Sequence, residues 1–489
     1  MAKVSKNILL FFLFSTLFLG VDAQINIRGS ANFAAGKELR IETYDDLLSK
    51  KKNLIHSSII DDKGNFDFSL NLRYPSLLFF SINFLSGEII LEPHKNYLLE
   101  LSVDTIYQNP LEISIHEVPL WIEIVEPKGI QLMGALVQLE EFIETFLGQE
   151  QRFNRLVFAR DYTVYDSLVN IINENFKSYD NNYFNIYKRY KVAQVEKIMY
   201  SKMTERLYDK FFTGHEIYYN NIAYMQFFDD FFKRYIQSPN SKIPKERLYE
   251  LINERFDYFE LEDFLGKDPI LVNEQIRELV LLKNLAELYK TQHFNKSNIL
   301  KYIYHIEQNS KFPEHKIIAK NMILDLAKLE SGYKPEINIA YTTKGDTVFL
   351  DKYRGKPLFI HLFTTDCLDC VKEMFAIQKL RKDFEGKINF VSISLDANSV
   401  KLFHFINSRP QFDWEILSFG NNYQWIKEYG IQSLPLNILL DEKGEILLYP
   451  SPDPSGELSR FLYQYFMEDY RPQPLEIPGS EGYKREIKN

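Results

Sequence analysis

The alternation of apolar and polar residues divides the chain into three regions. Between residues 25 and 125, short runs of alternating character are separated by turn sequences such as Asp61-Asp-Lys-Gly64-Asn. Alternation with a period of two places the apolar side chains on one face of a strand. We therefore expect a small antiparallel β-sandwich here, with strands that include residues 39–43, 66–70, 77–82 and 88–91.

From residue 130 to 330 the apolar residues recur at intervals of three and four, which is typical of amphipathic helices. The strongest segments are 130–147, 192–212, 222–236 and 271–289. Aromatic residues are dense in this region, as in Tyr218-Tyr219 and Phe227-Phe228. They favour an aromatic-packed helical core, and an aromatic ligand groove is the alternative.

After Ser331 the pattern changes to alternating strands and helices, which predicts an α/β domain. The expected strands are 347–350, 357–363, 388–394 and 435–440, and the expected helices are 370–384, 399–408, 421–429 and 456–468. The resulting domain plan is a leader over 1–23, a β-sandwich over 24–128, an all-α region over 129–332, the α/β domain over 333–470 and a flexible tail over 471–489.

Composition excludes several functions. The net charge of −9 and the absence of a basic stripe argue against nucleic-acid binding. The nine histidines contain no His-x-x-x-His pair, so we expect no metal site, and no glycine-rich phosphate-binding motif occurs.

The first residues resemble an export signal. Lys3 and Lys6 precede an apolar run from Ile8 to Val21, and Ala23 closes a small-residue cleavage sequence. An uncleaved membrane anchor is the alternative, although about fourteen apolar residues are short for a membrane span. We therefore expect the mature chain in the periplasm or cell envelope, cleaved near Ala23.

Cys367 and Cys370 are the only cysteines in the chain. They follow the apolar run Pro357–Phe363 and open a helix-like segment, which is the arrangement of a thioredoxin-type dithiol. The helix dipole and free backbone N–H groups favour a thiolate at the first cysteine. A structural bridge is the alternative, but a loop of two intervening residues removes little chain entropy.

Four segments in order make residues 335–470 resemble a TlpA/ResA-type thioredoxin domain of bacterial thiol-disulfide oxidoreductases. They are Gly345–Pro357, Cys367-Leu-Asp-Cys370, Phe390–Asp396, and Tyr429–Pro435 followed by Asn437–Gly444. The two regions ahead of it resemble, more loosely, the extra domains of exported Bacteroidetes members. The resemblance implies a thioredoxin fold, a redox-active Cys367–Cys370 disulfide and no cofactor beyond that pair.

The resemblance also assigns roles. Cys367 would attack a partner disulfide and Cys370 would resolve the mixed disulfide. Pro435 matches the loop proline that is cis in this fold, and it would place the Leu434 backbone against a substrate strand, although an ordinary strand-starting proline is the alternative.

Glu373 and His361 are candidates for supporting roles. Glu373 lies one turn beyond Cys370, where the family often has a glutamate that tunes the thiols, although it could also be a solvated helix glutamate. His361 lies on the strand beneath the helix, where it could relay the proton that Cys370 must lose or be an inert core histidine.

The chain departs from the family pattern at Asp366, where tryptophan is usual, and at Phe375, where proline is usual. Asp366, which we also expect to contact substrate, and Asp369 should raise the pKa of the Cys367 thiol and favour the disulfide. We therefore predict a reductase that takes electrons from a membrane donor and passes them to protein disulfides; the oligomeric state is left open.

Two other functions are alternatives. The thioredoxin fold could serve only as a scaffold in a redox-silent binding protein. A peroxidase of the peroxiredoxin type would require Pro-x-x-x-Thr-x-x-Cys, and residues 360–367 lack that motif.

Overall fold

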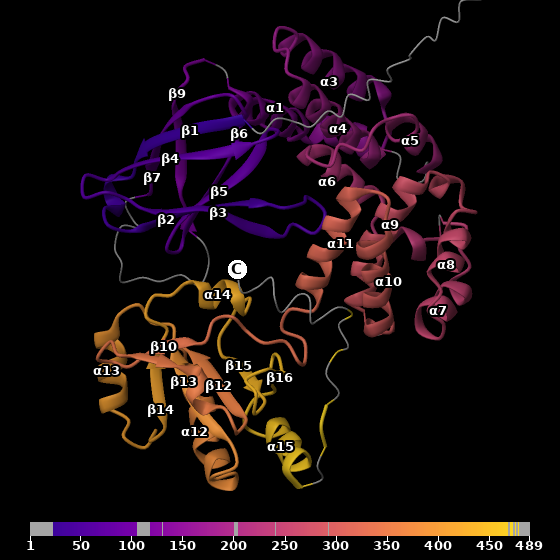
Figure 1. The fold of residues 1–489 in the computed structure, drawn as a ribbon. Coiled ribbons are helices and arrows are strands. Elements are labelled where there is room, and N and C mark those ends of the chain that lie inside the picture. The colour runs from indigo at the N-terminus through magenta and orange to yellow at the C-terminus, as the bar shows by residue number, and fades with distance from the viewer. Residues whose placement is uncertain are drawn as a thin grey trace, which may run out of the picture.

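The computed structural model describes residues 23–104, 118–129, 131–199, 204–239, 241–291 and 293–467, with residues 470–472, 475 and 478. The predicted leader up to residue 22 and most of the predicted tail lie outside the described residues. Figure 1 shows a β-sandwich, a helical region and a C-terminal α/β domain, as the sequence predicted. The sandwich is not wholly antiparallel as predicted, because residues 27–30 pair parallel with 97–100 and residues 85–86 with 118–119. Within the described part of the chain, no helix combines the length and apolar character needed to cross a membrane.

The N-terminal region consists of two sheets whose inner faces form one apolar core. In β4 every second residue is buried, from Phe66 to Leu72, because alternating side chains point to opposite faces of a strand. One sheet has the order β4 (Asn65–Leu72), β1 (Ala23–Ser30), β7 (Tyr97–Ser102) and β9 (Trp121–Glu126); the other has the order β3 (Lys52–Ile59), β2 (Glu38–Tyr44), β5 (Ser76–Ile82), β6 (Leu85–Leu91) and β8 (Val118–Pro119).

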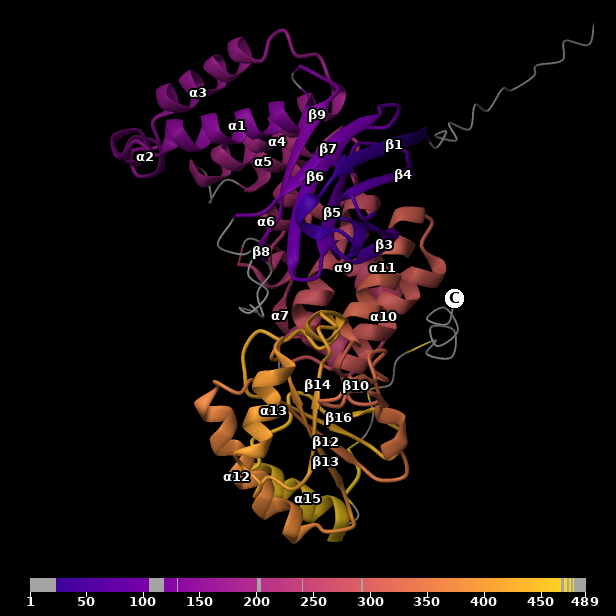
Figure 2. The same ribbon diagram turned by 90° about the vertical axis from the view of Figure 1, so that its left-hand side faces the viewer.

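The central region is helical, and Figure 2 shows it behind and above the C-terminal domain. Phe212 packs against the rings of Phe227 and Phe232 in its core. The helices are α1 (Leu132–Leu147), α2 (Glu150–Val157), α3 (Tyr162–Asn175), α4 (Asn182–Met199), α5 (Thr204–Phe211), α6 (Ile222–Phe231), α7 (Lys245–Asn253), α8 (Tyr258–Leu265), α9 (Glu274–Tyr289), α10 (Lys296–Asn309) and α11 (Pro313–Leu326).

One of the predicted helices has different bounds in the structure. The segment 222–236 ends as a helix at Phe231, because Arg234 adopts a left-handed conformation before a short 3₁₀ turn. Apolar spacing continues past this end, so periodicity alone could not locate it. Of the predicted helix 192–212, the structure describes α4 as far as Met199 and α5 from Thr204, and residues 200–203 lie outside the described residues.

The C-terminal domain contains a seven-stranded sheet and has the predicted thioredoxin fold. Strands β12, β13 and β14 are parallel, and β15 pairs antiparallel with β12. All six residues of β12 are buried because the sheet is covered on both faces. The sheet order is β11 (Thr347–Phe349), β10 (Ile339–Tyr341), β14 (Glu415–Ser418), β13 (Asn389–Ser394), β12 (Leu358–Phe363), β15 (Leu436–Leu440) and β16 (Ile446–Leu448).

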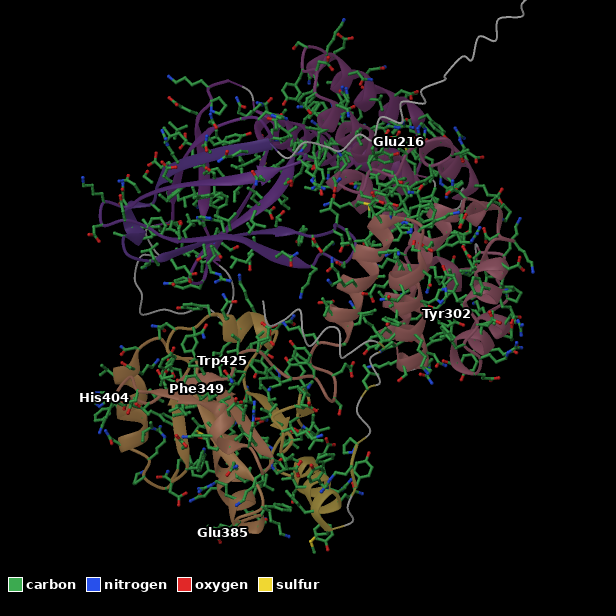
Figure 3. The ribbon with its side chains drawn as sticks, in the orientation of Figure 1. Glu216, Tyr302, Phe349, Glu385, His404 and Trp425 are labelled. Atoms are coloured by element: carbon green, nitrogen blue, oxygen red, sulfur yellow. A yellow bond between two sulfur atoms is a disulfide. The ribbon has the colours of Figure 1, made fainter. Side chains whose placement is uncertain are left out.

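Four helices complete this domain: α12 (Leu368–Asp383), α13 (Ser399–Asn407), α14 (Gln424–Glu428) and α15 (Glu457–Met467). Helix α14 lies toward the β-sandwich, and Figure 3 marks it with the buried Trp425. Beside Trp425, the Lys427 Nζ lies 3.2 Å from the Glu42 carboxylate of β2, and the Tyr423 ring packs on Phe84. The predicted domain boundaries, which fall between β9 and α1 and between α11 and β10, stay predictions.

Candidate active site

The two cysteines lie at the start of α12, directly after the loop that leaves β12. Cys367 is the N-cap of the helix, and the backbone N–H of Cys370 donates a hydrogen bond to its sulfur at 3.1 Å. The two sulfurs are joined in a disulfide, with their Cα atoms 5.2 Å apart. One helical turn therefore holds both sulfurs in reach of each other, with the helix N-terminus directed at Cys367.

The two sulfurs differ in exposure. Cys370 is fully buried, whereas Cys367 is half-buried and is followed by Leu368, which is 78% exposed. Cys367 is therefore the more accessible of the two cysteines. This asymmetry fits the attacking and resolving roles that the resemblance implied, and those roles stay predictions.

The loop before Cys367 is fixed by Asp396, at the end of β13. Its carboxylate accepts hydrogen bonds from the Thr365 backbone N–H at 2.8 Å and from the Thr365 hydroxyl at 3.0 Å. Ser394 donates a third hydrogen bond to it at 2.7 Å. Because this carboxylate is almost enclosed, it holds the loop, and thereby Cys367, at one position on the sheet.

The Leu434–Pro435 peptide bond is cis and leads directly into β15. Leu436 pairs with Leu362, one residue before the end of β12. The loop that contains Pro435 therefore lies beside the loop that carries Cys367, and Leu434 packs against the same apolar cluster as Cys367. Both loops therefore border one apolar cluster, and the predicted contact of the Leu434 backbone with a substrate stays a prediction.

A cluster of three polar side chains lies where α12 packs on the sheet. His361 on β12 stands directly opposite Asn437 on β15, and both are buried. The Asn437 amide donates to the Glu373 carboxyl at 2.8 Å, and the Nε2 of His361 lies 3.8 Å from the same oxygen. The structure thus brings His361 and Glu373 together, and it adds Asn437, which the sequence analysis missed.

Burial governs the protonation of this cluster. It raises the pKa of Glu373, despite the opposing hydrogen bond from Asn437, and it lowers the pKa of His361 to about 3. The imidazole of His361 is therefore neutral, so it does not form an ion pair with Glu373, because burial disfavours its charged state. The other ring nitrogen of His361 lies 3.3 Å from the Ser392 hydroxyl, which also accepts from the Trp414 indole N–H at 2.8 Å.

Two buried atoms of the cluster lack a hydrogen-bond partner: Nε2 of His361 and Oδ1 of Asn437. Buried polar atoms are costly when they are unpaired. The amide oxygen of Asn437 can only accept, and Nε2 of His361 accepts when Nδ1 carries the ring proton.

The two carboxylates next to Cys367 are both paired with lysines. Asp366 is exposed and contacts Lys401 of α13, and Asp369 lies 2.7 Å from Lys372 on its own helix. The sequence analysis treated both as isolated negative charges. Because the lysine partners offset much of that charge in solvent, the field at Cys367 is smaller than the sequence implied.

Two of the residues at the site were not identified from the sequence. Lys401 reaches Asp366 only because α13 packs beside the loop before Cys367. Asn437 could have been found from its position, since it lies two residues beyond Pro435 and therefore on the same face of the chain as that loop.

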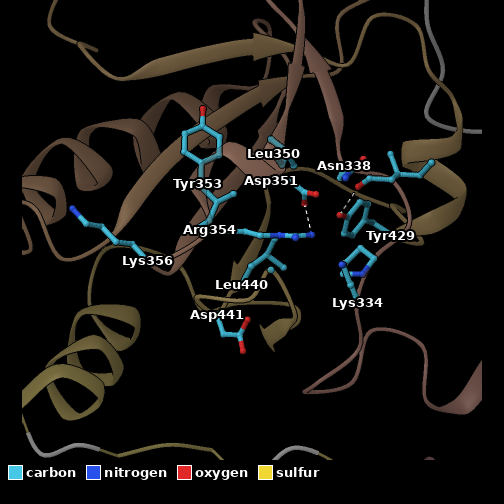
Figure 4. A pocket seen from close by; sticks show the side chains of 14 residues that line it. Lys334, Asn338, Leu350, Asp351, Tyr353, Arg354, Lys356, Tyr429, Leu440 and Asp441 are labelled. Carbon is cyan, nitrogen blue, oxygen red and sulfur yellow. Dashed lines mark hydrogen bonds and ion pairs between the residues drawn. The ribbon is translucent and has the colours of Figure 1, made fainter. Parts of the chain in front are cut away.

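A separate small cavity lies elsewhere in this domain, and Figure 4 shows it. It has a volume of about 20 Å³, near Arg354 and Tyr429, and contains neither cysteine. That volume holds about one water molecule, so the cavity is not a substrate site. Within the described ranges, no cluster of three or more His, Cys, Asp or Glu residues could hold a metal ion.

Comparison with known proteins finds similarity over the C-terminal domain. Residues 334–448 match the family described as AhpC/TSA. The thiol-disulfide oxidoreductase ResA of Bacillus thuringiensis is 24% identical over 122 residues, which are 24% of this chain and 69% of that protein. ResA of Halalkalibacterium halodurans is 23% identical over 154 residues, which are 31% of this chain and 84% of that protein.

Solved structures match the same part of the chain. A thiol-disulfide oxidoreductase from Bacteroides fragilis is 22% identical, with a TM-score of 0.24 over 26% of this chain and 96% of that one. The thioredoxin domain of a thiol-disulfide oxidoreductase from Bacteroides vulgatus is 19% identical, with a TM-score of 0.25 over 28% of this chain and 96% of that one.

Proposed function

We propose that this chain, whose C-terminal domain is that of a ResA-like thiol-disulfide oxidoreductase, reduces disulfide bonds of exported proteins through Cys367 and Cys370. The observation that carries this proposal is the accessible sulfur of Cys367, bonded to the enclosed sulfur of Cys370 at the N-terminus of α12.

The reaction is a two-electron exchange. In the reduced protein the Cys367 thiolate attacks one sulfur of the substrate disulfide, the substrate bond breaks, and the first substrate thiolate leaves. Cys370 then loses its proton and attacks Cys367, which releases the second substrate thiolate and closes the protein disulfide. The substrate gains two electrons and two protons, and a dithiol donor must reduce the protein again.

Glu373 takes the proton of Cys370 in this scheme, with His361 beside it. Cys370 is fully buried, so its thiol proton cannot pass directly to water. When Glu373 is ionised it can accept that proton, and the neutral ring of His361 lies 3.8 Å from the Glu373 carboxyl group. Asn437 positions the carboxyl group through its amide hydrogen bond.

The proposed direction is reductive. Asp366 and Asp369 place carboxylates beside Cys367, and the helix N-terminus is the opposing influence. Negative charge disfavours the thiolate and so favours the disulfide, which lowers the reduction potential. The lysine partners of both carboxylates reduce this contribution without removing it.

The reduction potential tests the direction. We expect equilibration of the wild-type chain with glutathione or dithiothreitol buffers to give a value below about −230 mV, nearer to thioredoxin than to disulfide isomerases. Lys401→Ala should lower the potential by roughly 10 mV, because it leaves the charge of Asp366 unpaired.

Asp366→Asn provides the matched control and should shift the potential upward by a similar amount. A potential above about −180 mV, the range of protein disulfide isomerase, would reject the reductive direction.

The place of action and the partners form part of the proposal. The amino-terminal signal pattern supports export to the periplasm or cell envelope. In an oxidising compartment a dithiol is maintained only by a continuing supply of electrons. We therefore assign the electron supply to a membrane-bound thiol donor and the acceptor role to protein disulfides.

Insulin reduction tests the activity. With dithiothreitol as electron donor, the wild-type chain should accelerate precipitation of the insulin B chain, and a Cys367→Ser/Cys370→Ser variant should not exceed the uncatalysed rate. Equal rates for the two would support the alternative of a redox-silent scaffold.

A further inference from the structure

A groove with a volume of about 550 Å³ lies where the β-sandwich meets the helical region. It is formed by the turn between β4 and β5, the first turn of α4, the loop before α6 and the first turn of α11. Its twelve lining residues include four tyrosines, four asparagines and one carboxylate, with no lysine or arginine. The volume lies within the usual range of ligand sites.

The walls of the groove are fixed by contacts outside it. The side chain of Asn181 donates to Glu92 of the β-sandwich at 3.1 Å and accepts from the backbone of α4. Asn221 caps α6, and its amide donates to the Tyr183 carbonyl at 3.1 Å. The groove is therefore preformed, which lowers the entropic cost of binding.

The aromatic walls are also fixed. The ring of Tyr218 packs edge-on against Tyr190 and Tyr224 in the helical core. The hydroxyl group of Tyr219 accepts from the Gln275 amide at 3.1 Å and lies 2.7 Å from a ring nitrogen of His315. Neither ring is fully buried, so each contributes both to the core and to the groove surface.

The rim of the groove offers exposed amide and aromatic groups. Asn182 and Asn220 are exposed, and Tyr74 is 41% exposed. Tyrosine supplies rigid contact area, and asparagine supplies adaptable hydrogen bonds, a combination that antibody paratopes use to bind polypeptides. An asparagine side chain is itself an amide, so it can donate to and accept from a peptide group at once.

We propose that this groove binds an extended segment of an unfolded polypeptide. The identification of that polypeptide as the disulfide-bearing substrate rests on the proposed function. Ile186, Ile217 and Pro75 add apolar contacts for its side chains. These contacts favour a polypeptide, which has aliphatic side chains, over a saccharide, whose apolar surface is limited to the C–H faces of its rings. The carboxylate of Glu314, with no cation in the lining, favours a neutral or basic segment.

Binding of reduced, carbamidomethylated ribonuclease A to the full chain tests this inference. This probe is a basic unfolded polypeptide without thiols or disulfides. In fluorescence anisotropy at about 0.15 M salt, we expect Tyr74→Ala and Asn220→Ala each to weaken binding about fivefold. Tyr249→Ala is the matched control, because this residue of α7 is 46% exposed, lies outside the groove and should leave the affinity unchanged.

Equal affinities for Tyr74→Ala, Asn220→Ala and Tyr249→Ala would overturn the inference. Displacement of the probe by maltotriose or chitotriose would show that the groove binds saccharides instead. Circular dichroism of each variant separates a lost contact from a lost fold.

The binding measurement is independent of the redox chemistry, because it can be repeated in the Cys367→Ser/Cys370→Ser chain. If the wild-type chain binds the probe but does not accelerate insulin reduction, the proposed function is rejected and the groove assignment stays intact. If both hold, Tyr74→Ala should raise KM for insulin about fivefold, with kcat unchanged and with turnover of glutathione disulfide unaffected.

Discussion

Cys370→Ser should convert the protein into a covalent trap for its substrate. Cys367 remains able to attack a disulfide, but no second sulfur can release the product. We expect the mixed disulfide to persist for minutes to hours, whereas wild-type resolution is faster by more than about 10³-fold. Non-reducing electrophoresis followed by mass spectrometry of the retained partner measures the complex.

Cys367→Ser is the control, because Cys370 is fully buried and should capture nothing. Trapping through Cys370 in that variant would contradict the assignment of the attacking and resolving roles. The identity of the partner retained by Cys370→Ser would also name the substrate of the chain.

Glu373→Gln should change how the rate at which Cys370 resolves the mixed disulfide depends on pH. Burial raises the pKa of Glu373, so below that pKa the carboxyl group is already protonated and cannot accept the proton of Cys370. The wild-type rate should therefore rise as the pH rises through this pKa and then level off. In Glu373→Gln the rise should move toward the ordinary thiol pKa of about 8.5, with a loss of about 100-fold at neutral pH.

The measurement is single-turnover kinetics of mixed-disulfide resolution between about pH 5 and 9. His361→Asn is the matched variant: since the pKa of His361 is lowered to about 3, its ring stays neutral over that range. We expect this variant to keep the rise while losing about tenfold in rate. Superimposable profiles for wild type and Glu373→Gln would remove Glu373 from the proton path.

The cis peptide at Pro435 and the position of Leu434 followed from the resemblance to a family, since neither leaves a pattern in composition or spacing. Short elements were harder to predict. Strands β10, β14 and β16 have three or four residues each, too few for a period to be recognised.

Electrostatics around the cysteines could be read only in part from the sequence. Asp366 and Asp369 are local neighbours of Cys367, so their charges were evident. The sequence did not indicate that Lys401, on another helix, pairs with Asp366, or that Asn437 faces Glu373 across the core.

The sequence by itself determined the three-region plan, the thioredoxin fold and the pair Cys367–Cys370, because periodicity and a strand–Cys-x-x-Cys–helix order are local properties of the chain. Only the tertiary structure showed how far each cysteine is buried, that His361, Glu373 and Asn437 lie together, and that tyrosines and asparagines from separate segments share a groove. Those features depend on contacts between residues distant in sequence, and burial, which sets the pKa of Glu373 and His361, exists only once the chain has folded.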